Sequence, residues 1–318
     1  MLNYIDIVKI IACLLIVNFH TLYIYPESLQ FLSFGGDLGN NTFFLVSGFL
    51  LYDKTRKTPW NTAHKWLIKR YVRILPIVLL LEMLTVLVLK TNIGCFGEFI
   101  RVFIFPSQYW FTGALLLFYP LFFVVVRTLD FRGWLAIAAV LLIFHAVFDS
   151  LYAERYIMGF LALLAGAEFR ETTGGKLDSK LSPGKAWLLL IGTLLAYAVL
   201  KFVYAKRELM PLHILIGILT IGFALFLLIS ISKYEARISA HLNKHKRLGQ
   251  IVRHLSQMTL FFYIGQQFIN KILVQKFLLL PFGARIVLYW LLTLAGAVVL
   301  YLIDLGIHGR KRRLNTSR

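Results

Sequence analysis

Long apolar segments alternate with short polar ones along the whole chain. Each apolar segment ends at a cluster of charged residues or of Pro and Gly, as membrane-spanning helices do. The second, fifth and sixth segments are shorter than the roughly 20 residues that a span requires, so we expect these helices to be tilted, broken or partly shielded by neighbours. The pattern predicts ten transmembrane helices, at residues 5–24, 38–52, 74–89, 109–126, 134–149, 155–168, 186–204, 211–232, 256–275 and 284–305.

The composition agrees with an all-α, polytopic membrane protein. Of the 318 residues, 59% are hydrophobic and only 15% are charged, and the mean hydropathy is +0.74. These values exclude an ordinary soluble domain. Neither a long linker nor an internal repeat divides the chain, so we expect a single integral-membrane domain over residues 1–318.

The net charge of +19 is best explained as an orientation signal. In a soluble protein it would suggest nucleic-acid binding, but membrane proteins concentrate Lys and Arg in their cytoplasmic loops. With the N-terminus inside, more than two thirds of the 34 Lys and Arg residues fall in the predicted cytoplasmic segments. Segments rich in Lys and Arg alternate with segments poor in them along the chain, and an odd number of spans would break this alternation. We therefore expect ten spans and both termini in the cytoplasm.

The first apolar segment carries ionisable residues that are costly inside a membrane. Asp6 and Lys9 lie near its start and His20 near its end, and Asp or Lys at mid-membrane costs on the order of 2.5–3.5 kcal/mol. In a helix, the spacing of Lys9 and His20 places them within roughly 20° on one face and about 16 Å apart along the axis. Cys13 falls on the same stripe, where it is best explained as a small core residue. The sequence therefore predicts a polar line that faces an internal cavity.

A second candidate region combines an acidic, glycine-rich loop with an aromatic helix, FGGDLGN followed by NTFFLVSGFLLYD. Asp37 would stand at the external mouth, where it can hold a hydroxylated substrate. Ser47 and Gly48 lie in the middle of the span, and Gly48 would let a ligand approach the backbone closely. The alternative is that this small pair serves only close helix packing.

Two further groups lie at the ends of predicted helices. Arg70 and Arg73 stand one turn apart at the cytoplasmic entry of the third helix, where they either orient the chain or clamp phosphate groups. Pro76 then falls early in that helix, where a missing amide donor costs least. Trp110, next to Tyr109, stands at the outer end of the fourth helix, either in an aromatic belt or as a wall of a substrate site.

The remaining histidines and cysteines give weaker signals. A lone histidine in a span is more often a packing or hydrogen-bonded residue than a catalyst, and we interpret His145 and His213 in this way. Cys13 and Cys95 have no spacing typical of a disulfide framework or a metal site, so we expect no metal.

The order and spacing of these motifs resemble those of the acyltransferase-3 family. IDIVK followed by His20 is similar to the family's Asp, basic residue, ten intervening residues and His, and FFLVSGF, RYVR and YWF follow in the expected order over nearly the whole chain. Two positions depart from the pattern. Lys9 stands where members often carry Arg, and it cannot form the bidentate fork of a guanidinium. Gln266 stands where members often carry His, and the resemblance assigns it no role.

The resemblance implies an enzyme of the bacterial cytoplasmic membrane that moves acyl groups, usually acetyl, from acyl-CoA onto hydroxyls of cell-surface saccharides or related acceptors. It implies His20 as general base or transient acyl carrier, supported on its helix face by Asp6. Lys9, Arg70 and Arg73 would hold the phosphates of the acyl-CoA, because moving those charges into hydrocarbon is prohibitive. The pantetheine arm, on the order of 15–20 Å long, matches the predicted rise of about 16 Å from Lys9 to His20.

Two other classes of function fit parts of the pattern. A transporter or flippase for a lipid-linked saccharide would also use ten helices, a basic inner face and intramembrane charges that form a proton or substrate path. A sensor or scaffold module would not require His20, Lys9 and the Arg pair together. Transfer of label from acetyl-CoA to an acceptor distinguishes the enzyme from the transporter.

Overall fold

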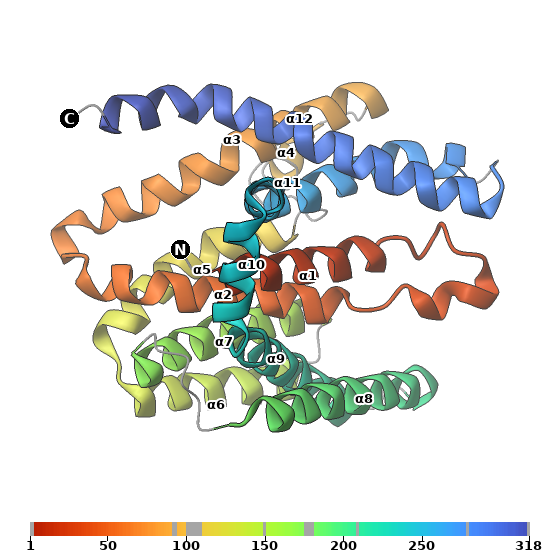
Figure 1. Cartoon of the computed structure of the whole chain (residues 1–318). Helices are drawn as coiled ribbons and strands as arrows, with labels where there is room; N and C mark the ends of the chain where they lie inside the picture. Colours follow the sequence, from red (N-terminus) through yellow and green to blue (C-terminus); the bar gives the residue numbers. More distant parts are fainter. Residues whose placement is uncertain are drawn as a thin grey trace. The chain divides into compact units, whose positions relative to one another are not determined.

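Helices form nearly all of the structure. The computed structural model describes residues 3–90, 94–99, 110–148, 151–174, 181–207, 210–277 and 280–316, and it contains no strand in them. Figure 1 shows the helices along the chain. They are α1 (Asn3–Phe19), η1 (Glu27–Leu32), α2 (Gly36–Lys57), η2 (Trp60–Thr62), α3 (Ala63–Leu89), α4 (Phe96–Phe99), α5 (Trp110–Thr128), α6 (Phe131–Phe148), α7 (Leu151–Thr173), α8 (Pro183–Arg207), α9 (Met210–Ser232), α10 (Glu235–Lys244), α11 (Lys246–Phe277) and α12 (Phe282–Thr316).

Each apolar segment predicted from the sequence corresponds to one long helix of the described structure. Five of these helices are long and apolar enough to cross a membrane, which is typical of a multi-pass membrane protein. That all ten helices cross, with both termini on the cytoplasmic side, stays a prediction. Among the described residues, the five candidate spans are Trp60–Leu89, Trp110–Thr128, Pro183–Tyr204, Leu212–Ser232 and Phe282–Ile307.

The chain folds into two compact units. The first contains Met1–Ile16, Gly35–Ala63 and Phe118–Ser256, and the second contains Val17–Phe34, His64–Leu117 and Gln257–Arg318. The helices α1 and α11 each supply residues to both units. The single integral-membrane domain over the whole chain stays a prediction.

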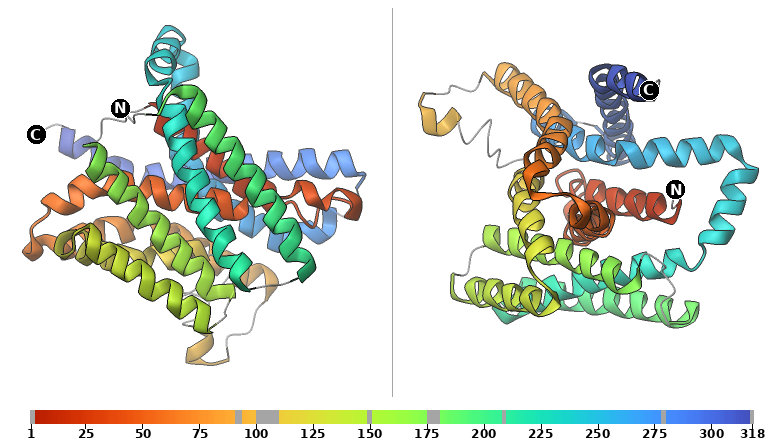
Figure 2. Two further views of the ribbon diagram at one scale, coloured as in Figure 1. Left: turned by 90° about the horizontal axis from the view of Figure 1, so that it is seen from below. Right: turned by 90° about the vertical axis from the view of Figure 1, so that its left-hand side faces the viewer.

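The core of the first unit is built around α2, which packs against α7 and α9. Another helix, α8, runs along α9, as Figure 2 shows. Several polar side chains of α2 are buried, among them Asn40, Asn41 and Thr42. The amide of Asn41 donates a hydrogen bond to Thr220 on α9 (2.5 Å). A helix surrounded by other helices need not be apolar, because polar side chains such as that of Asn41 find partners within the protein.

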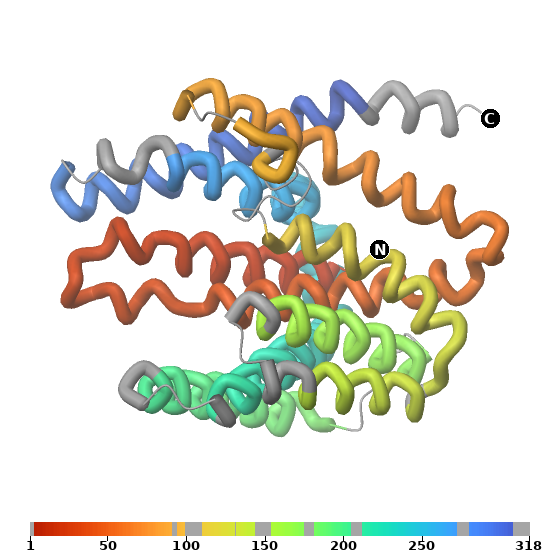
Figure 3. The backbone as a smooth tube through the Cα atoms, turned by 180° about the vertical axis from the view of Figure 1, so that it is seen from behind, coloured from red at the N-terminus to blue at the C-terminus, as the bar shows by residue number. Residues whose placement is uncertain are grey.

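Glycines allow the helices of the first unit to approach each other closely. A Cβ atom at Gly48 would overlap the carbonyl oxygen of Leu163 on α7, and one at Gly166 would overlap the carbonyl oxygen of Leu45 on α2. Figure 3 shows α1 and α2 as neighbouring tubes at the red end of the chain. There a Cβ at Gly39 would come within 2.5 Å of the Ala12 carbonyl oxygen. Close helix packing, one of the two explanations for the Ser-Gly pair, therefore accounts for Gly48.

One face of α8 exposes a regular stripe of large apolar side chains. The stripe recurs every three or four residues, which is the period of a single helix face. Apolar surface of this extent on a helix indicates contact with lipid rather than with water. Its members are Leu188, Ile191, Leu195, Val199 and Phe202.

The first helix ends earlier than the apolar pattern predicts. Residues 5–24 were expected to form one helix, but α1 ends at Phe19. The backbone amide of Thr21 and its hydroxyl both donate to the carbonyl of Asn18, at 3.0 and 2.5 Å. That carbonyl is the acceptor that a continuing helix would offer to Leu22. The prediction of one helix through residue 24 is therefore wrong, and His20 is the first residue of the turn.

The position of Pro76 also differs from the prediction. Because α3 begins at Ala63, Pro76 lies inside the helix and not in its first turn. The basic residues before it were expected to precede the helix, yet they are helical themselves. A proline at this place leaves the carbonyl of Val72 without its usual amide partner four residues later.

Replacing Gly48 with Ala should destabilise the protein, because the added methyl group meets the backbone of α7. Overpacking of this kind costs typically about 1–3 kcal/mol, so we expect a lower midpoint of thermal unfolding in detergent. Gly192→Ala on α8 is the matched control, since nothing lies within 4 Å of a Cβ there, and its midpoint should stay equal or rise. If Gly48→Ala kept the wild-type midpoint, the packing explanation would fail.

Candidate functional site

His20 is held by α11 in the second unit. The Nε2 atom of its half-buried ring lies 2.9 Å from the side-chain amide nitrogen of Gln267. The amide of Asn270 donates to the backbone carbonyl of His20 at 3.4 Å, and the ring of Phe19 meets the imidazole edge-on with centroids 5.4 Å apart. An amide nitrogen can only donate, so in the neutral ring Nε2 accepts and Nδ1 carries the proton. These contacts fix the position and the orientation of the imidazole.

Polar side chains continue along the same part of α11. Gln266 is fully buried, and neither of its amide atoms has a hydrogen-bond partner among the described residues. The Oδ1 atom of Asn270 is also buried without a partner in that part of the chain. Buried polar atoms are nearly always bonded in proteins, so such groups indicate a ligand or water that bonds to them.

A second polar cluster lies in the first unit. The hydroxyl of Ser256 on α11 donates to the carboxylate of Asp6 at 2.5 Å and accepts from the ammonium of Lys9 at 3.1 Å. Ser256 and Asp6 are both buried. The structure therefore brings together the two charged residues that the sequence placed on one face of α1, through a serine that the sequence reasoning missed.

The arginine pair of α3 belongs to the second unit, and its two members have different surroundings. The guanidinium of Arg70 lies over the indole of Trp66, 3.3 Å from the ring centroid, and donates to the Trp66 carbonyl at 2.7 Å. Arg73 is exposed. The side chain of Arg70 therefore packs against its own helix, whereas the side chain of Arg73 is exposed. A phosphate clamp formed by both stays a prediction.

The residues predicted to line an acceptor site are distributed over both units. In the first unit, Asp37 opens α2 and forms an ion pair with Lys201 on α8, with Oδ2 and Nζ 2.9 Å apart. Ser47 is half-buried on the same helix as Gly48. In the second unit, Trp110 begins α5, and its indole meets Phe111 edge-on. Tyr109 lies outside the described residues.

His213 has the hydrogen-bonded role expected of a lone histidine in a span. Its Nδ1 atom lies 3.3 Å from a carboxylate oxygen of Glu154, and the ring of Tyr204 stacks on the imidazole with centroids 3.9 Å apart. The side chain of His145 is outside the described part of the chain. No group of three or more metal-ligating His, Cys, Asp or Glu residues occurs in the regions that the structure describes.

Sequence reasoning also missed the residues that position His20. Gln267 and Asn270 lie on the face of α11 that begins with Ser256, because the polar positions of SQMTLFFYIGQQFIN recur every three or four residues. That spacing was the available signal, since a polar stripe on an apolar helix indicates a face directed toward protein. The partner of that face could not be identified from the spacing.

The helices and polar clusters described above define a multi-pass membrane protein with buried polar side chains on α1 and α11. The family model described as an acyltransferase domain matches residues 2–303, nearly the whole chain. The chain therefore belongs to the acyltransferase-3 family, as its motifs predicted. No curated protein and no solved structure matches it.

Ser256→Ala should lower the stability of the first unit, because it leaves a buried carboxylate and an ammonium without their shared partner. Loss of such a partner costs about 1–3 kcal/mol, which we expect as a lower midpoint of thermal unfolding. Ser230→Ala is the matched control, because the Ser230 hydroxyl is buried without a partner among the described residues. An equal change in the two variants would show that the bridge to Asp6 and Lys9 contributes nothing.

Proposed function

We propose that this protein transfers an acyl group, acetyl in the simplest case, from a cytoplasmic acyl-CoA to a hydroxyl of a cell-surface saccharide or a related acceptor. The observation that carries the proposal is the arrangement of His20, whose ring and backbone are both bonded to α11. Fixed orientation is what a catalytic imidazole requires. Membership in the acyltransferase-3 family supports acyl transfer as the reaction.

In the direct reaction, His20 acts as the general base. The imidazole takes the proton of the acceptor hydroxyl while the hydroxyl oxygen attacks the thioester carbonyl carbon. The C–S bond then breaks, the imidazolium returns its proton to the thiolate of CoA, and an ester and a free thiol result. For this step one ring nitrogen must be free to accept. Rotation of the Gln267 amide would provide it, because its oxygen would then accept from Nε2–H and leave Nδ1 unprotonated.

In a two-step variant, His20 carries the acyl group. An imidazole nitrogen attacks the thioester, CoA leaves as the thiol, and the acceptor hydroxyl then takes the acyl group from the acetyl-imidazole. This route suits a donor and an acceptor that arrive from opposite sides of the membrane. In both routes negative charge develops on the carbonyl oxygen. The buried amide of Gln266 is a suitable donor to that oxygen.

The predicted binding residues divide between donor and acceptor. Lys9, Arg70 and Arg73 would bind the phosphates of the acyl-CoA at the cytoplasmic side. The acceptor would bind at the opposite side, near the residues predicted from the aromatic helix and its neighbours. We place the protein in the bacterial cytoplasmic membrane, with ten spans, both termini inside and membrane lipid around it. The residues proposed for the acceptor site are Asp37, Ser47 and Trp110. Gly48 is not among them, because the backbone of α7 already fills the space beside it.

His20→Ala should abolish transfer of radiolabel from acetyl-CoA to the acceptor while the protein remains folded and inserted. General bases contribute about 10²–10⁴-fold to such rates, so we expect at least a hundredfold loss. His64→Ala is the control, because His64 is an exposed histidine at the start of α3. Turnover close to wild type in His20→Ala would remove His20 from both routes. Movement of an unlabelled saccharide across vesicles without label transfer would support the transporter instead.

Gln267→Ala should lower kcat by about tenfold to a hundredfold and leave the KM for acyl-CoA unchanged, because Gln267 positions His20 without contacting the donor. The separation of kcat from KM is the decisive measurement, since a general loss of folded protein would lower the amount of active enzyme and the unfolding midpoint together. Gln250→Ala, which changes an exposed glutamine on the same helix, should leave both constants at their wild-type values. An unchanged kcat in Gln267→Ala would contradict the positioning role.

A further inference from the structure

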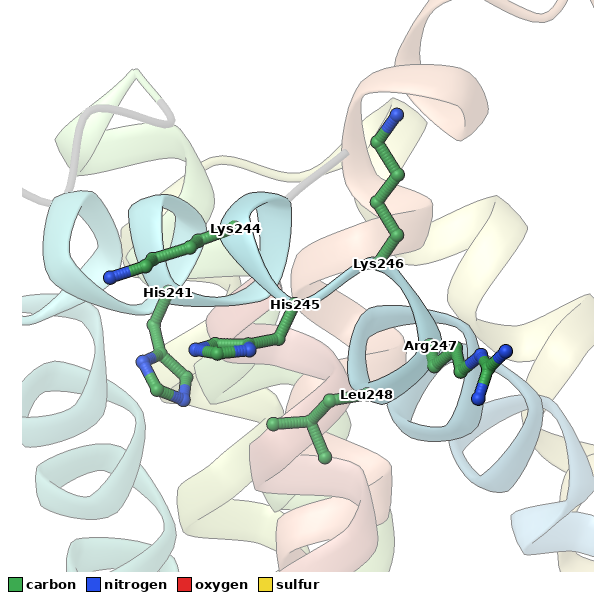
Figure 4. A pocket seen from close by; sticks show the side chains of 6 residues that line it. All are labelled: His241, Lys244, His245, Lys246, Arg247 and Leu248. Carbon is green, nitrogen blue, oxygen red and sulfur yellow. The ribbon is translucent and has the colours of Figure 1, made fainter.

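An open basic cavity lies in the first unit where α10 meets α11. Its volume is about 760 Å³, within the range of small-molecule sites. Figure 4 shows both imidazole rings and Leu248 facing the same space, with Lys244 beside them, while Lys246 and Arg247 extend from the junction in other directions. The residues that line the cavity are His241, Lys244, His245, Lys246, Arg247 and Leu248.

The break between the two helices creates this concentration of basic side chains. α10 ends at Lys244 and α11 begins at Lys246, so His245 is the turning point of the backbone. The rings of His241 and His245 lie with centroids 4.7 Å apart. Because the chain changes direction here, the two imidazole rings and Leu248 face one space, while Lys246 and Arg247 extend from the same junction to either side of it.

No acidic side chain of the surrounding sequence neutralises the cavity. Between Glu235 and Asp304 the chain contains neither Asp nor Glu. The carboxylate of Glu235 bonds to the start of α1, where it accepts hydrogen bonds from the backbone amides of Asn3 at 3.2 Å and Tyr4 at 2.8 Å. In the described structure, none of the five basic side chains of the cavity forms an ion pair. Lys244, Lys246 and Arg247 therefore gather three positive charges at the junction without an ion-pair partner in the described structure.

The contacts of α10 hold the cavity at a defined place in the first unit. The side chain of Asn3 donates to Ser239 at 2.8 Å, and Ser239 donates to Glu235 at 2.8 Å, so α10 is bonded to the start of α1. Along α11, the helix from Lys246 to Ser256 rises about 15 Å. Ser256 is the residue that bonds Asp6 and Lys9. The cavity therefore lies at the end of α1 where the predicted donor-binding residue Lys9 is found.

We propose that this cavity binds phosphate groups. Lysine ammonium groups act as point charges for phosphate, and a guanidinium can bind two phosphate oxygens together. Lys244 lies beside the two imidazole rings, and Lys246 and Arg247 carry their charges at the same helix junction. Two sources can supply this chemistry, the nucleotide end of acyl-CoA and the headgroup of an anionic phospholipid. The nucleotide source rests on the proposed function, whereas the headgroup source does not.

Binding of adenosine 3′,5′-bisphosphate, a soluble fragment of CoA, tests the nucleotide source. The full-length protein, held in nanodiscs of zwitterionic lipid, is titrated by calorimetry with the bisphosphate and with adenosine. The triple variant Lys244→Gln, Lys246→Gln, Arg247→Gln should weaken bisphosphate binding at least tenfold. The control triple variant Arg132→Gln, Lys185→Gln, Arg253→Gln removes the same charge from exposed residues outside the cavity and should change binding less than twofold.

Anionic lipid tests the headgroup source with the same two variants. Phosphatidylglycerol bound to the protein is counted by native mass spectrometry after purification in its presence, and the unfolding midpoint shows that each variant is folded. Loss of bisphosphate binding in the cavity variant alone assigns the site to the nucleotide, and loss of bound phosphatidylglycerol alone assigns it to the headgroup. Equal behaviour of the two variants toward both ligands, or no binding by the wild type, overturns the proposal.

The two proposals can fail separately. Label transfer by the wild-type protein is measured in the same preparation. Cavity-dependent bisphosphate or phosphatidylglycerol binding without any label transfer would reject the acyltransferase mechanism and retain the phosphate site. Normal label transfer, together with equal phosphate binding by the two triple variants, would reject the phosphate site and retain the acyltransferase mechanism.

Discussion

The structure depends on one constraint: polar side chains on apolar helices must find their hydrogen-bond partners within the protein, because hydrocarbon offers none. The polar residues of α1 and of the turn after it meet this constraint on α11. In the first unit Ser256 joins Asp6 and Lys9, and in the second unit Gln267 and Asn270 bond His20. One helix thus supplies hydrogen-bond partners to Asp6, Lys9 and His20 of the first apolar segment. The candidate catalytic residue His20 therefore lies where the fold already requires polar contacts.

The existence and order of the long helices could be predicted from the sequence, although α3 and α11 each begin about ten residues before the predicted segment. Apolar length is a strong signal in a membrane protein, since a spanning backbone must bond internally over the thickness of the bilayer. Helix ends were less predictable because they depend on local competition. The hydroxyl of Thr21 donates a hydrogen bond to the carbonyl of Asn18, and a hydropathy pattern does not predict such a bond. The short helix α10 was missed because it is polar and lies in a segment expected to be a loop.

Part of the candidate site could also be predicted. Helical spacing placed Asp6 and Lys9 on one face, and their common partner Ser256 agrees with that placement. The residues that orient His20 could not be found in the same way, because Gln267 lies 247 positions further along the chain. Spacing within a helix shows which side chains share a face. Which other helix meets that face is decided by tertiary packing, and the sequence of one chain carries no direct signal of it.

The length of α11 has a consequence for access. Its 32 residues extend about 48 Å, whereas the hydrocarbon of a bilayer is about 30 Å thick. A helix of this length that crosses a membrane stands well clear of the lipid at one end. The first two residues of α11, Lys246 and Arg247, are both exposed. The same helix therefore presents exposed basic side chains at its start and a fully buried amide, that of Gln266, two thirds of the way along.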